Sequence, residues 1–403
     1  MVKSLRGMND ITGLESEKFN FIIETSSRIA KKYGFEYIET PLLEETALFK
    51  RSVGESSDIV GKEMYQFIDK GKNDVCLRPE GTAGVVRSFI QNKLDRKGEK
   101  QKFFYFGSMF RYERPQKGRF RLFHQFGCES FGESSVFEDA SIILMIRDIF
   151  ETLEISFTLK INSLGCSECM PKYRANLIID LEKKRDELCE DCNRRIEINP
   201  IRTLDCKSES CQTKLSDSPK IVDNLCEECY SDFDKLKKIL SENGVDFEID
   251  KHLVRGLDYY SKTAFEFVSD EVGSQNAIAG GGRYDKLVEF LDGKPTPAVG
   301  FALGIERILD LVTLPKTDME GWYFGVLDEE NLETIFNLAS RKRVFQKVHI
   351  EYRKRSLKTH IKNALKMGYQ HCAILGSDEV ANRTIWVKDL KAKYEEIISQ
   401  DSF

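Results

Sequence analysis

Near its start the chain has apolar residues at helical spacing, and a stretch in which apolar and polar residues alternate follows. Between Glu15 and Lys32, apolar residues recur every three or four positions, which predicts an amphipathic helix ending at Tyr33 and Gly34. Residues 35–41 then read as a strand that closes on a proline. Up to about residue 165, and again from about 246 to 315, β-rich and helical runs alternate. This pattern predicts a mixed domain built from two separate stretches of chain.

The region between these stretches has a different character. Residues 172–195 form a charged helical stretch, and eight of the eleven cysteines fall between residues 166 and 229. We interpret residues 166–245 as a small inserted domain. After a linker at 313–320, the remaining chain predicts helix, strand, helix, strand and helix at residues 332–339, 348–352, 357–367, 371–375 and 390–398. Strands that alternate with helices are typical of a small α/β domain.

Length and composition limit the class of protein. A chain of 403 residues exceeds one ordinary core, so two or three domains are expected. Hydrophobic content of 41% and charged content of 32% fit a soluble globular protein. The sequence has no apolar run of about 18 residues and its start lacks the apolar core of a secretory signal, so we expect a cytoplasmic protein without membrane spans. A net charge of -5 leaves global attraction to nucleic acid weak, so RNA contacts need local basic surfaces.

Residues 105–132 are the most informative segment of the chain about function. Two strand-like runs flank a loop with five cations, Arg111, Arg114, Lys117, Arg119 and Arg121. Strand alternation places one row of side chains on a single face, namely Arg121, Phe123, Gln125, Gly127 and Glu129. So many charges beside a sheet are costly unless an anionic ligand needs them. The row predicts the floor of a site for a polar substrate. The alternative is an exposed charged hairpin.

This hairpin closely resembles motif 2 of class II aminoacyl-tRNA synthetases, in the form carried by histidyl-tRNA synthetases. Further segments match that family in the same order, at residues 77–84, 253–260, 280–285 and 297–307, and the Arg-Gly-Leu-Asp-Tyr-Tyr block ending at Tyr260 is specific to the histidine enzymes. The helix and strand at 15–41 resemble motif 1, the dimer interface of the class.

The resemblance covers nearly the whole chain and implies an α+β fold. Residues 1–165 and 246–315 would form an antiparallel-sheet catalytic domain, interrupted by the Cys-rich helical insertion at 166–245. Residues 320–403 would form an α/β anticodon-binding domain. The implied activity joins L-histidine to ATP as histidyl-adenylate and transfers the histidyl group to the 3′ end of tRNA(His), with Mg²⁺ accompanying ATP. The implied assembly is a homodimer.

The family motifs assign roles to several residues. The resemblance places Arg111 at the α-phosphate of ATP, Arg307 at the γ-phosphate, and Arg255 near the α-phosphate as a fixed cation in place of a metal. Guanidinium groups suit this role because they bind phosphate oxygens bidentately. For each arginine taken alone, a surface ion pair is the alternative.

An imidazole offers one donor and one acceptor, so a pocket that recognises it needs a carboxylate and a hydroxyl. The resemblance assigns these roles to Glu129 and Tyr260. It assigns the α-ammonium and carboxylate of histidine to Glu80, Thr82 and Gln125, and closure of the pocket to Tyr284. Core packing is the alternative for both tyrosines. His124 falls on the opposite strand face from Gln125, so we expect a structural histidine and not a general base.

Local basic segments are the expected RNA contacts. In the motif 2 loop, Arg114, Gln116 and Arg121 are placed at the acceptor end of tRNA, while Lys117 and Arg119 suit phosphates. In the last domain, residues 341–343 and 353–358 form basic patches. A solvated helix face is the alternative for each patch.

The eight clustered cysteines have zinc-like spacing. They form four pairs, Cys166/Cys169, Cys189/Cys192, Cys206/Cys211 and Cys226/Cys229. Joining the first two pairs is disfavoured because a helix of roughly 15 residues between them spans about 22 Å. We therefore expect a crossed arrangement of two zinc sites, one of Cys166, Cys169, Cys206 and Cys211 and one of Cys189, Cys192, Cys226 and Cys229. Reduced, metal-free thiols are the alternative.

One competing function stays open. A regulatory paralogue can keep this catalytic fold as a histidine-sensing subunit of histidine biosynthesis. Such a protein need not keep the ATP arginines or the C-terminal domain, whereas this chain has Arg111, Arg255, Arg307 and a plausible C-terminal domain. A non-catalytic RNA-binding scaffold is the third possibility.

Overall fold

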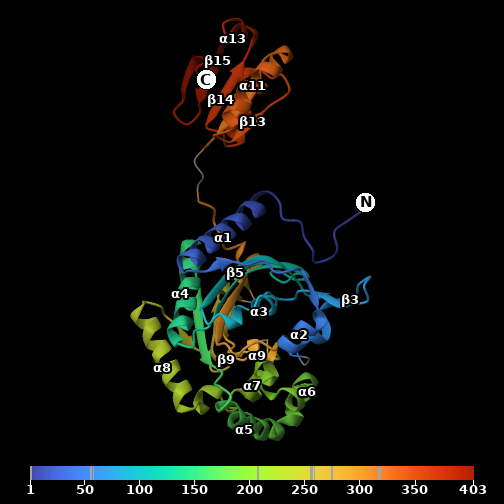
Figure 1. Cartoon of the computed structure of the whole chain (residues 1–403). Coiled ribbons are helices and arrows are strands. Elements are labelled where there is room, and N and C mark those ends of the chain that lie inside the picture. The colour runs from blue at the N-terminus through green and yellow to red at the C-terminus, as the bar shows by residue number, and fades with distance from the viewer. Residues whose placement is uncertain are drawn as a thin grey trace. The chain divides into compact units, whose positions relative to one another are not determined.

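The structure is a computed structural model that describes residues 2–54, 57, 59–206, 208–254, 257, 259–273, 276–315 and 319–403. These residues form two compact units, Met1–Thr313 and Leu314–Phe403, coloured from blue to orange and from orange to red (Figure 1). Among the described residues, no helix is both long and apolar enough to cross a membrane.

Within the described residues of the first unit, an eight-stranded sheet has the order β1-β5-β6-β11-β10-β9-β7-β8. Its strands are β1 (Glu36–Tyr37), β5 (Gln101–Phe110), β6 (Leu122–Phe131), β7 (Thr158–Ser163), β8 (Glu248–Ile249), β9 (Ser261–Val268), β10 (Ala277–Arg283) and β11 (Ala298–Gly304). Neighbours from β5 to β7 are antiparallel, whereas the two-residue edge strands pair in parallel. The predicted antiparallel sheet is confirmed, and it is built from both sides of the cysteine-rich segment.

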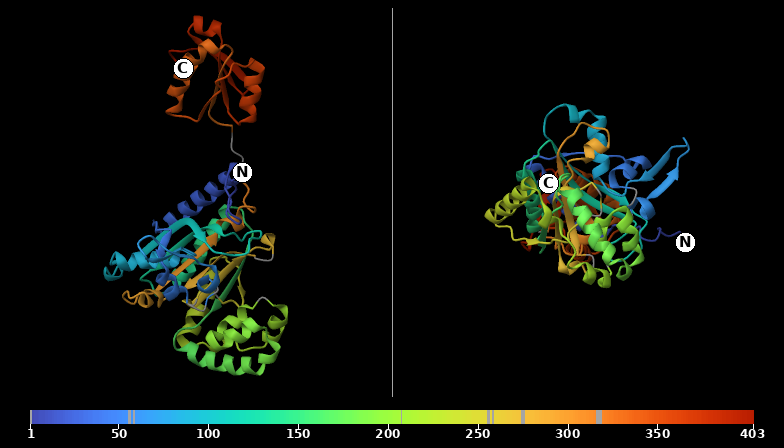
Figure 2. Two further views of the ribbon diagram at one scale, coloured as in Figure 1. Left: turned by 90° about the vertical axis from the view of Figure 1, so that its right-hand side faces the viewer. Right: turned by 90° about the horizontal axis from the view of Figure 1, so that it is seen from below.

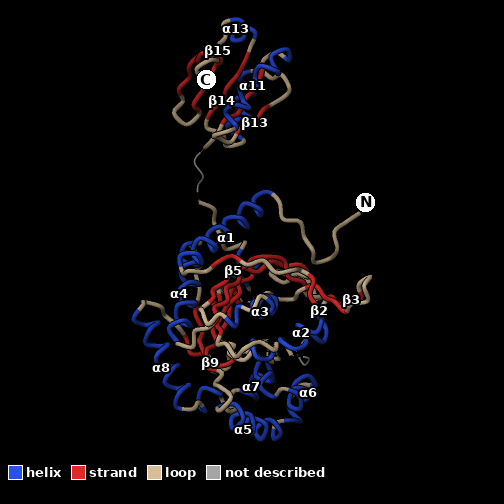
Figure 3. The backbone as a smooth tube through the Cα atoms, in the orientation of Figure 1, coloured by secondary structure: helices blue, strands red, loops and turns tan. Residues whose placement is uncertain are grey.

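Different helices cover the two faces of this sheet. Helices α1 (Gly13–Lys32) and α4 (Val136–Thr152) pack on one face, where Phe104, Phe126 and Cys128 join their core. Helix α3 (Thr82–Gln91) packs on the other face against Phe103 and Phe131. In Figure 3, α1 lies above β5 and α3 below it. Alternation along β5 and β6 supplies both apolar surfaces, since successive side chains point to opposite faces.

The N-terminal helix is confirmed, and the strand after it is shorter than expected. Ile22, Ile29 and Ala30 lie on the buried stripe of α1, and the chain turns at Gly34 with a φ of +82°. Of residues 35–41, two form β1. Arg78 holds the end of this segment, because its Nη1 donates to the carbonyl oxygen of Thr40 at 2.9 Å.

A small sheet lies beside α3. In the described residues its order is β2-β4-β3, with β2 (Leu43–Glu45), β3 (Tyr65–Ile68) and β4 (Asp74–Leu77). Helix α2 (Thr46–Val53) packs on the face that carries Cys76. Leu43 and Phe67 belong to the opposite face, because they pair with Leu77 and Val75 of β4. Their side chains are 48% and 45% exposed.

The cysteine-rich segment is helical, as expected. It contains α5 (Cys169–Lys183), α6 (Glu190–Ile198), α7 (Glu209–Leu215) and α8 (Glu227–Glu242), which gather at one end of the first unit (Figure 2). Leu177, Leu181 and several cysteines form its own small core. The later part of α8 belongs elsewhere, because Leu236 and Leu240 join the main core beside α4. The insertion is therefore tied to the large sheet through α8.

The second unit is an α/β sandwich with one wrongly predicted element. Its described residues form a five-stranded sheet in the order β13-β12-β14-β15-β16. The strands are β12 (Trp322–Val326), β13 (Val348–Ile350), β14 (His371–Leu375), β15 (Thr384–Asp389) and β16 (Tyr394–Ser399), and the helices are α11 (Leu332–Arg343), α12 (Leu357–Lys366) and α13 (Ser377–Ala381).

The helix predicted at 390–398 is wrong, since that stretch turns and returns as β16. The Asp389 carboxylate accepts the backbone N–H groups of Lys391 and Ala392 at 2.8 and 2.7 Å, and Lys393 has a φ of +55°. This turn reverses the chain so that Ile398 pairs with Ile385 of β15. Pairing with a neighbouring strand therefore overrides the helix-forming composition of the run.

Candidate functional site

A cavity of about 200 Å³ opens on the α3 side of the large sheet. Its walls come from the β5–β6 hairpin, the start of α3, and strands β9, β10 and β11. Six of the residues expected from sequence line it together, namely Glu80, Thr82, Arg111, Gln125, Tyr260 and Arg307. These residues span 228 positions of sequence, so the fold gathers them. Arg255 lies outside the described residues.

Two arginines line the cavity together. Arg111 donates from Nε to the carbonyl oxygen of Pro79 at 2.9 Å, and its guanidinium lies 5.2 Å from the centre of the Phe123 ring. Arg307 donates to the carbonyl oxygens of Ala277 at 2.6 Å and Gly118 at 3.3 Å. Burial lowers the pKa of Arg307, and repulsion from Arg111 lowers it further. Paired cations in a half-buried cavity suit an anionic ligand.

Glu80 is set by the first turn of α3. Its carboxylate accepts the backbone N–H groups of Thr82 at 2.6 Å and Ala83 at 2.9 Å, which satisfies donors that a helix start leaves free. Burial raises the pKa of Glu80, while these N–H groups oppose the shift. The carboxylate is thereby fixed in direction at the cavity wall.

Glu129 is fully buried beneath the cavity and is not one of its lining residues. Three hydroxyl groups converge on its carboxylate. Thr82 donates at 2.7 Å, Tyr105 at 3.2 Å, and Tyr284 donates to the other oxygen. Burial raises the pKa of Glu129 to about 8, although the hydroxyl groups favour the charged form. Thr82 links this carboxyl to the cavity, and Tyr260 lies at the wall while Tyr284 lies in the layer beneath.

Close packing around this network requires glycine. Gly300 of β11 lies opposite Glu129 of β6, and a Cβ there would lie 1.8 Å from Glu129 Oε2. A Cβ at Gly81 would lie 2.1 Å from the Tyr105 ring. The glycines of the sequence motifs therefore make room for a buried carboxyl and its hydroxyl partners.

Sequence reasoning missed several polar residues of this cavity. Glu113, Glu266 and Glu306 also line it. Arg119, expected to face phosphates of RNA, lines it as well and pairs with Glu113 and with Glu63 at 3.6 Å. The register of β9 against β10, which pairs Glu266 with Gly280, brings that glutamate to the glycine run. Only its position opposite the conspicuous glycines could have signalled it.

The expectation for His124 is confirmed. Its Nδ1 lies 2.7 Å from Glu306, its Nε2 lies 3.1 Å from the Ser108 hydroxyl, and its ring meets Phe19 edge-on at 4.9 Å. His124 is thus held among protein groups on the α1 side of the strand.

Arg114, Gln116 and Arg121, expected at the acceptor end of tRNA, do not line the cavity, although Gly118, Arg119 and Phe120 of the same loop do. Arg114 and Gln116 are exposed. Arg121 lies over the Tyr112 ring at 3.9 Å and donates to the carbonyl oxygen of Glu113 at 3.1 Å. Of the three, Arg121 therefore contacts a lining residue, Glu113.

The predicted pairing of the cysteines is wrong. One group contains Cys166, Cys169, Cys226 and Cys229, and the other contains Cys189, Cys192, Cys206 and Cys211. The arrangement is nested and not crossed. The outer pairs meet because the segment after β7 lies beside the start of α8, while the inner pairs meet because α6 and the turn at 200–205 fold back on each other. Within each group, all four sulfur atoms lie within 4.8 Å of one another.

Comparison with known proteins shows the family of the chain. A model of the family described as histidyl-tRNA synthetase matches residues 7–308. A histidine–tRNA ligase from Sulfurimonas denitrificans is 62% identical over 403 residues and covers 100% of both chains. One from Campylobacter fetus is 58% identical over 402 residues, covering 99% of this chain and 98% of the relative.

Solved structures agree. Apo histidyl-tRNA synthetase from S. aureus has a TM-score of 0.83 at 32% identity, covering 100% of this chain and 98% of that one. Fold and cavity define a class II aminoacyl-tRNA synthetase. The chain belongs to the histidyl-tRNA synthetase family.

Glu129 generates a prediction about stability. Its carboxyl has an ordinary pKa of 4.5 and a folded pKa of about 8. Between these values the folded state holds a proton that the unfolded chain has released. The stabilising effect is complete below the lower value and is lost as pH rises through the higher one. In wild type the free energy of unfolding should therefore decrease with pH. Glu129→Gln removes the titrating group, so this slope should become shallower by up to about 1.4 kcal/mol per pH unit, the value for one proton.

Urea unfolding between pH 5 and 8, followed by far-UV circular dichroism, measures this slope. Both tryptophans, Trp322 and Trp386, lie in the second unit. Their fluorescence is therefore an internal control whose transition should not change. Parallel slopes for the wild type and Glu129→Gln would contradict the assigned protonation.

Proposed function

We propose that this chain is a histidine–tRNA ligase. A carboxylate oxygen of L-histidine attacks the α-phosphorus of ATP, forming histidyl-adenylate and releasing pyrophosphate. The histidyl group then passes to a ribose hydroxyl at the 3′ end of tRNA(His), and AMP leaves. The observation that carries the proposal is full-length identity of 62% to a histidine–tRNA ligase, in a chain whose cavity is lined by Arg111, Arg307 and Glu80.

Arg111 and Arg307 are the proposed triphosphate ligands, at the α- and γ-phosphates. Both line one cavity and both are fixed by backbone carbonyl oxygens, so they need little reorganisation when charge develops on the phosphate. We assign Arg255 to the α-phosphate by its motif alone, and Mg²⁺ accompanies ATP in the reaction.

Glu80, Thr82 and Gln125 are the proposed contacts to the α-ammonium and carboxylate of histidine. Gln125 has a buried Oε1 without a hydrogen-bond partner among the described residues. A buried acceptor at a cavity wall is costly unless a ligand donates to it, and an ammonium group donates three hydrogen bonds.

The proposed partners of the imidazole are Tyr260 at the wall and Glu129 beneath it, with Tyr284 holding Glu129. Glu129 would meet the ring by exchanging one of its hydroxyl partners for the ring N–H. Buried polar partners of this kind reject an amino acid that lacks the matching group.

Relatives favour the ligase over the regulatory paralogue. Those with 62% and 58% identity are named histidine–tRNA ligases. A structure described as an ATP phosphoribosyltransferase regulatory subunit/histidyl-tRNA synthetase from Bacillus halodurans is 20% identical with a TM-score of 0.65, a likeness in fold alone.

Replacing the α-phosphate ligand tests the activation step. Arg111→Ala should reduce histidine-dependent ATP–pyrophosphate exchange by a factor of roughly 100 to 1,000, because a fixed donor to the developing charge is lost. The exposed Arg96 serves as a matched control, and Arg96→Ala should retain exchange. Wild-type protein without any exchange would support the paralogue and end the ligase proposal.

The second unit is the proposed anticodon-binding domain, and the hairpin loop is the proposed contact to the acceptor end through Arg114, Gln116 and Arg121. Arg353 and Arg355 are exposed just before α12, where they give the unit a local positive surface. Such a surface suits phosphates even in a chain with a net charge of -5.

Neutralising that surface should separate the two reaction steps. Arg353→Ala with Arg355→Ala should raise the KM for tRNA several-fold and leave ATP–pyrophosphate exchange unchanged, because exchange needs no tRNA. Arg383→Ala removes another exposed cation of the same unit and should change neither rate. An equal loss of exchange and aminoacylation would count against the RNA role.

A homodimer is the proposed assembly. Leu43 and Phe67 share the uncovered face of the small sheet, and Tyr37 on the edge strand β1 is 46% exposed. Apolar side chains on an uncovered sheet face suit an interface between copies. A cytoplasmic location accords with eleven free thiols.

Charging the uncovered face tests the assembly. Leu43→Asp with Phe67→Asp should convert a dimer to a monomer in analytical ultracentrifugation at micromolar concentration, because two carboxylates would be buried without partners. Ile397→Asp, at a 65% exposed position of the second unit, should leave the mass unchanged. A wild-type monomer under these conditions would contradict the proposal.

A further inference from the structure

Two groups of four cysteines in the insertion have the geometry of metal sites. We name them the outer site (Cys166, Cys169, Cys226 and Cys229) and the inner site (Cys189, Cys192, Cys206 and Cys211). We propose that each holds one structural zinc ion in a four-thiolate shell, and that the outer ion also positions Tyr260 at the wall of the cavity.

Sulfur separations fit a single ion. Four thiolates about 2.3 Å from a tetrahedral zinc stand about 3.8 Å apart. In the outer site, Cys166 Sγ lies 3.7 Å from Cys169 Sγ and 3.8 Å from Cys226 Sγ. In the inner site, Cys189 Sγ and Cys206 Sγ are 3.8 Å apart. An iron–sulfur cluster places several atoms between its thiolates and needs a wider shell.

Local structure directs backbone N–H groups and helix starts at these cysteines. In each site one Cys-x-x-Cys pair begins a helix, with Cys189 before α6 and Cys226 before α8. Helix starts carry partial positive charge, which suits the net negative charge of a zinc ion with four cysteine ligands. Backbone N–H groups also point at sulfur, from Cys226 to Cys169 Sγ at 3.1 Å and from Cys189 to Cys211 Sγ at 3.3 Å.

Ordinary core packing is the competing explanation, since thiols are often buried. Core packing does not explain why eight cysteines from four separate segments converge as two complete sets of four sulfur donors. The insertion also has a small core for its length, in which five of the buried members are cysteines, Cys169, Cys192, Cys206, Cys211 and Cys229. Small domains of this kind commonly depend on a bound metal for stability.

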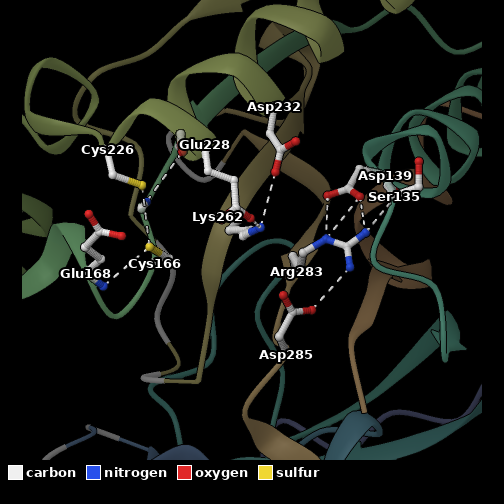
Figure 4. Close-up of polar contacts among 12 residues, drawn as sticks. Ser135, Asp139, Cys166, Glu168, Cys226, Glu228, Asp232, Lys262, Arg283 and Asp285 are labelled. Carbon is white, nitrogen blue, oxygen red and sulfur yellow. Dashed lines mark hydrogen bonds and ion pairs between the residues drawn. The ribbon is translucent and has the colours of Figure 1, made fainter. Parts of the chain in front are cut away.

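The outer site is joined to the cavity wall through Lys262. Its backbone N–H donates to the Gly165 carbonyl oxygen at 2.7 Å, directly before Cys166. Its Nζ lies 2.7 Å from Glu228, between Cys226 and Cys229, and 3.2 Å from Asp232. Figure 4 shows the Lys262 side chain directed at these acidic groups. Lys262 thus contacts both segments that supply the outer site, the one that leads into Cys166 and the one between Cys226 and Cys229.

Tyr260 is two residues before Lys262, lines the cavity and packs against the core of the insertion. An ion that closes the outer site would therefore fix the backbone from which Tyr260 projects. This makes the outer cysteines positioning residues for the amino acid, a role that rests on the histidine contact proposed for Tyr260. The zinc content itself does not depend on that function.

Metal content of the intact protein is the first test. Wild-type protein purified without chelator should carry about two zinc ions per chain by elemental analysis, one for each cysteine group. X-ray absorption should report four sulfur neighbours at about 2.3 Å. Iron in place of zinc, or protein that neither contains zinc nor takes it up on titration, overturns the assignment. This test requires no variant to fold.

Serine variants test the nested arrangement. Replacing all four outer cysteines should leave one zinc per chain, whereas replacing Cys166, Cys169, Cys206 and Cys211 together should leave none. The opposite result would overturn the nesting. Cys372→Ser, a buried cysteine of the second unit, is the matched control and should keep both ions.

Chelation of the wild type tests positioning without mutation. Removing zinc should raise the KM for histidine in ATP–pyrophosphate exchange several-fold with a smaller change in kcat, and added zinc should restore it. The four-serine outer variant should reproduce the higher KM, and the corresponding inner variant should raise it less. Equal KM values in the two variants overturn the positioning role, even with both ions present in the wild type. Absence of exchange in zinc-loaded wild type would instead contradict the proposed function.

Discussion

A carboxyl group removed from water sets the geometry of this molecule's cavity. Glu129 lies in the middle of the large sheet, where burial raises its pKa to about 8. Three hydroxyl groups, from Thr82, Tyr105 and Tyr284, offset part of the cost of burying it. Each comes from a different segment, so the need to partner one carboxyl ties α3, β5 and the end of β10 to β6. Gly81 and Gly300 are required because this network leaves no space for a Cβ.

The same sheet brings distant charges to one place. Arg111 follows β5, Arg307 follows β11, and the antiparallel order of β5, β6 and β11 puts both beside the cavity. Each guanidinium donates to backbone carbonyl oxygens of neighbouring segments, so the cations are oriented before a ligand arrives. Such preorganisation suits a reaction in which charge develops on a phosphate and little covalent work falls to the protein.

The insertion serves as more than a surface addition. Lys262 connects its base to β9, and α8 shares the main core with α4. Its nested cysteine groups place one set of thiols at this base and the other within the helical bundle. The inner group therefore lies within the insertion, whereas the outer group lies at its junction with β9. Tyr260 belongs to this junction, because it is two residues before Lys262.

The sequence by itself determined most of the local elements and the identity of six of the residues that line the cavity. Periodicity predicted α1, strand alternation predicted the row from Arg121 to Glu129, and resemblance to the synthetase motifs selected Glu80, Gln125, Arg111 and Arg307. The first two signals are short in range and depend on the repeat of a helix or strand. Tertiary structure alone decided that Glu129 lies beneath the cavity, that Glu266 reaches its wall, that β16 replaces the expected helix, and that the cysteines nest. Each of these outcomes depends on how separate segments meet in space, and the free energy of that meeting comes from burial and pairing, which local spacing does not encode.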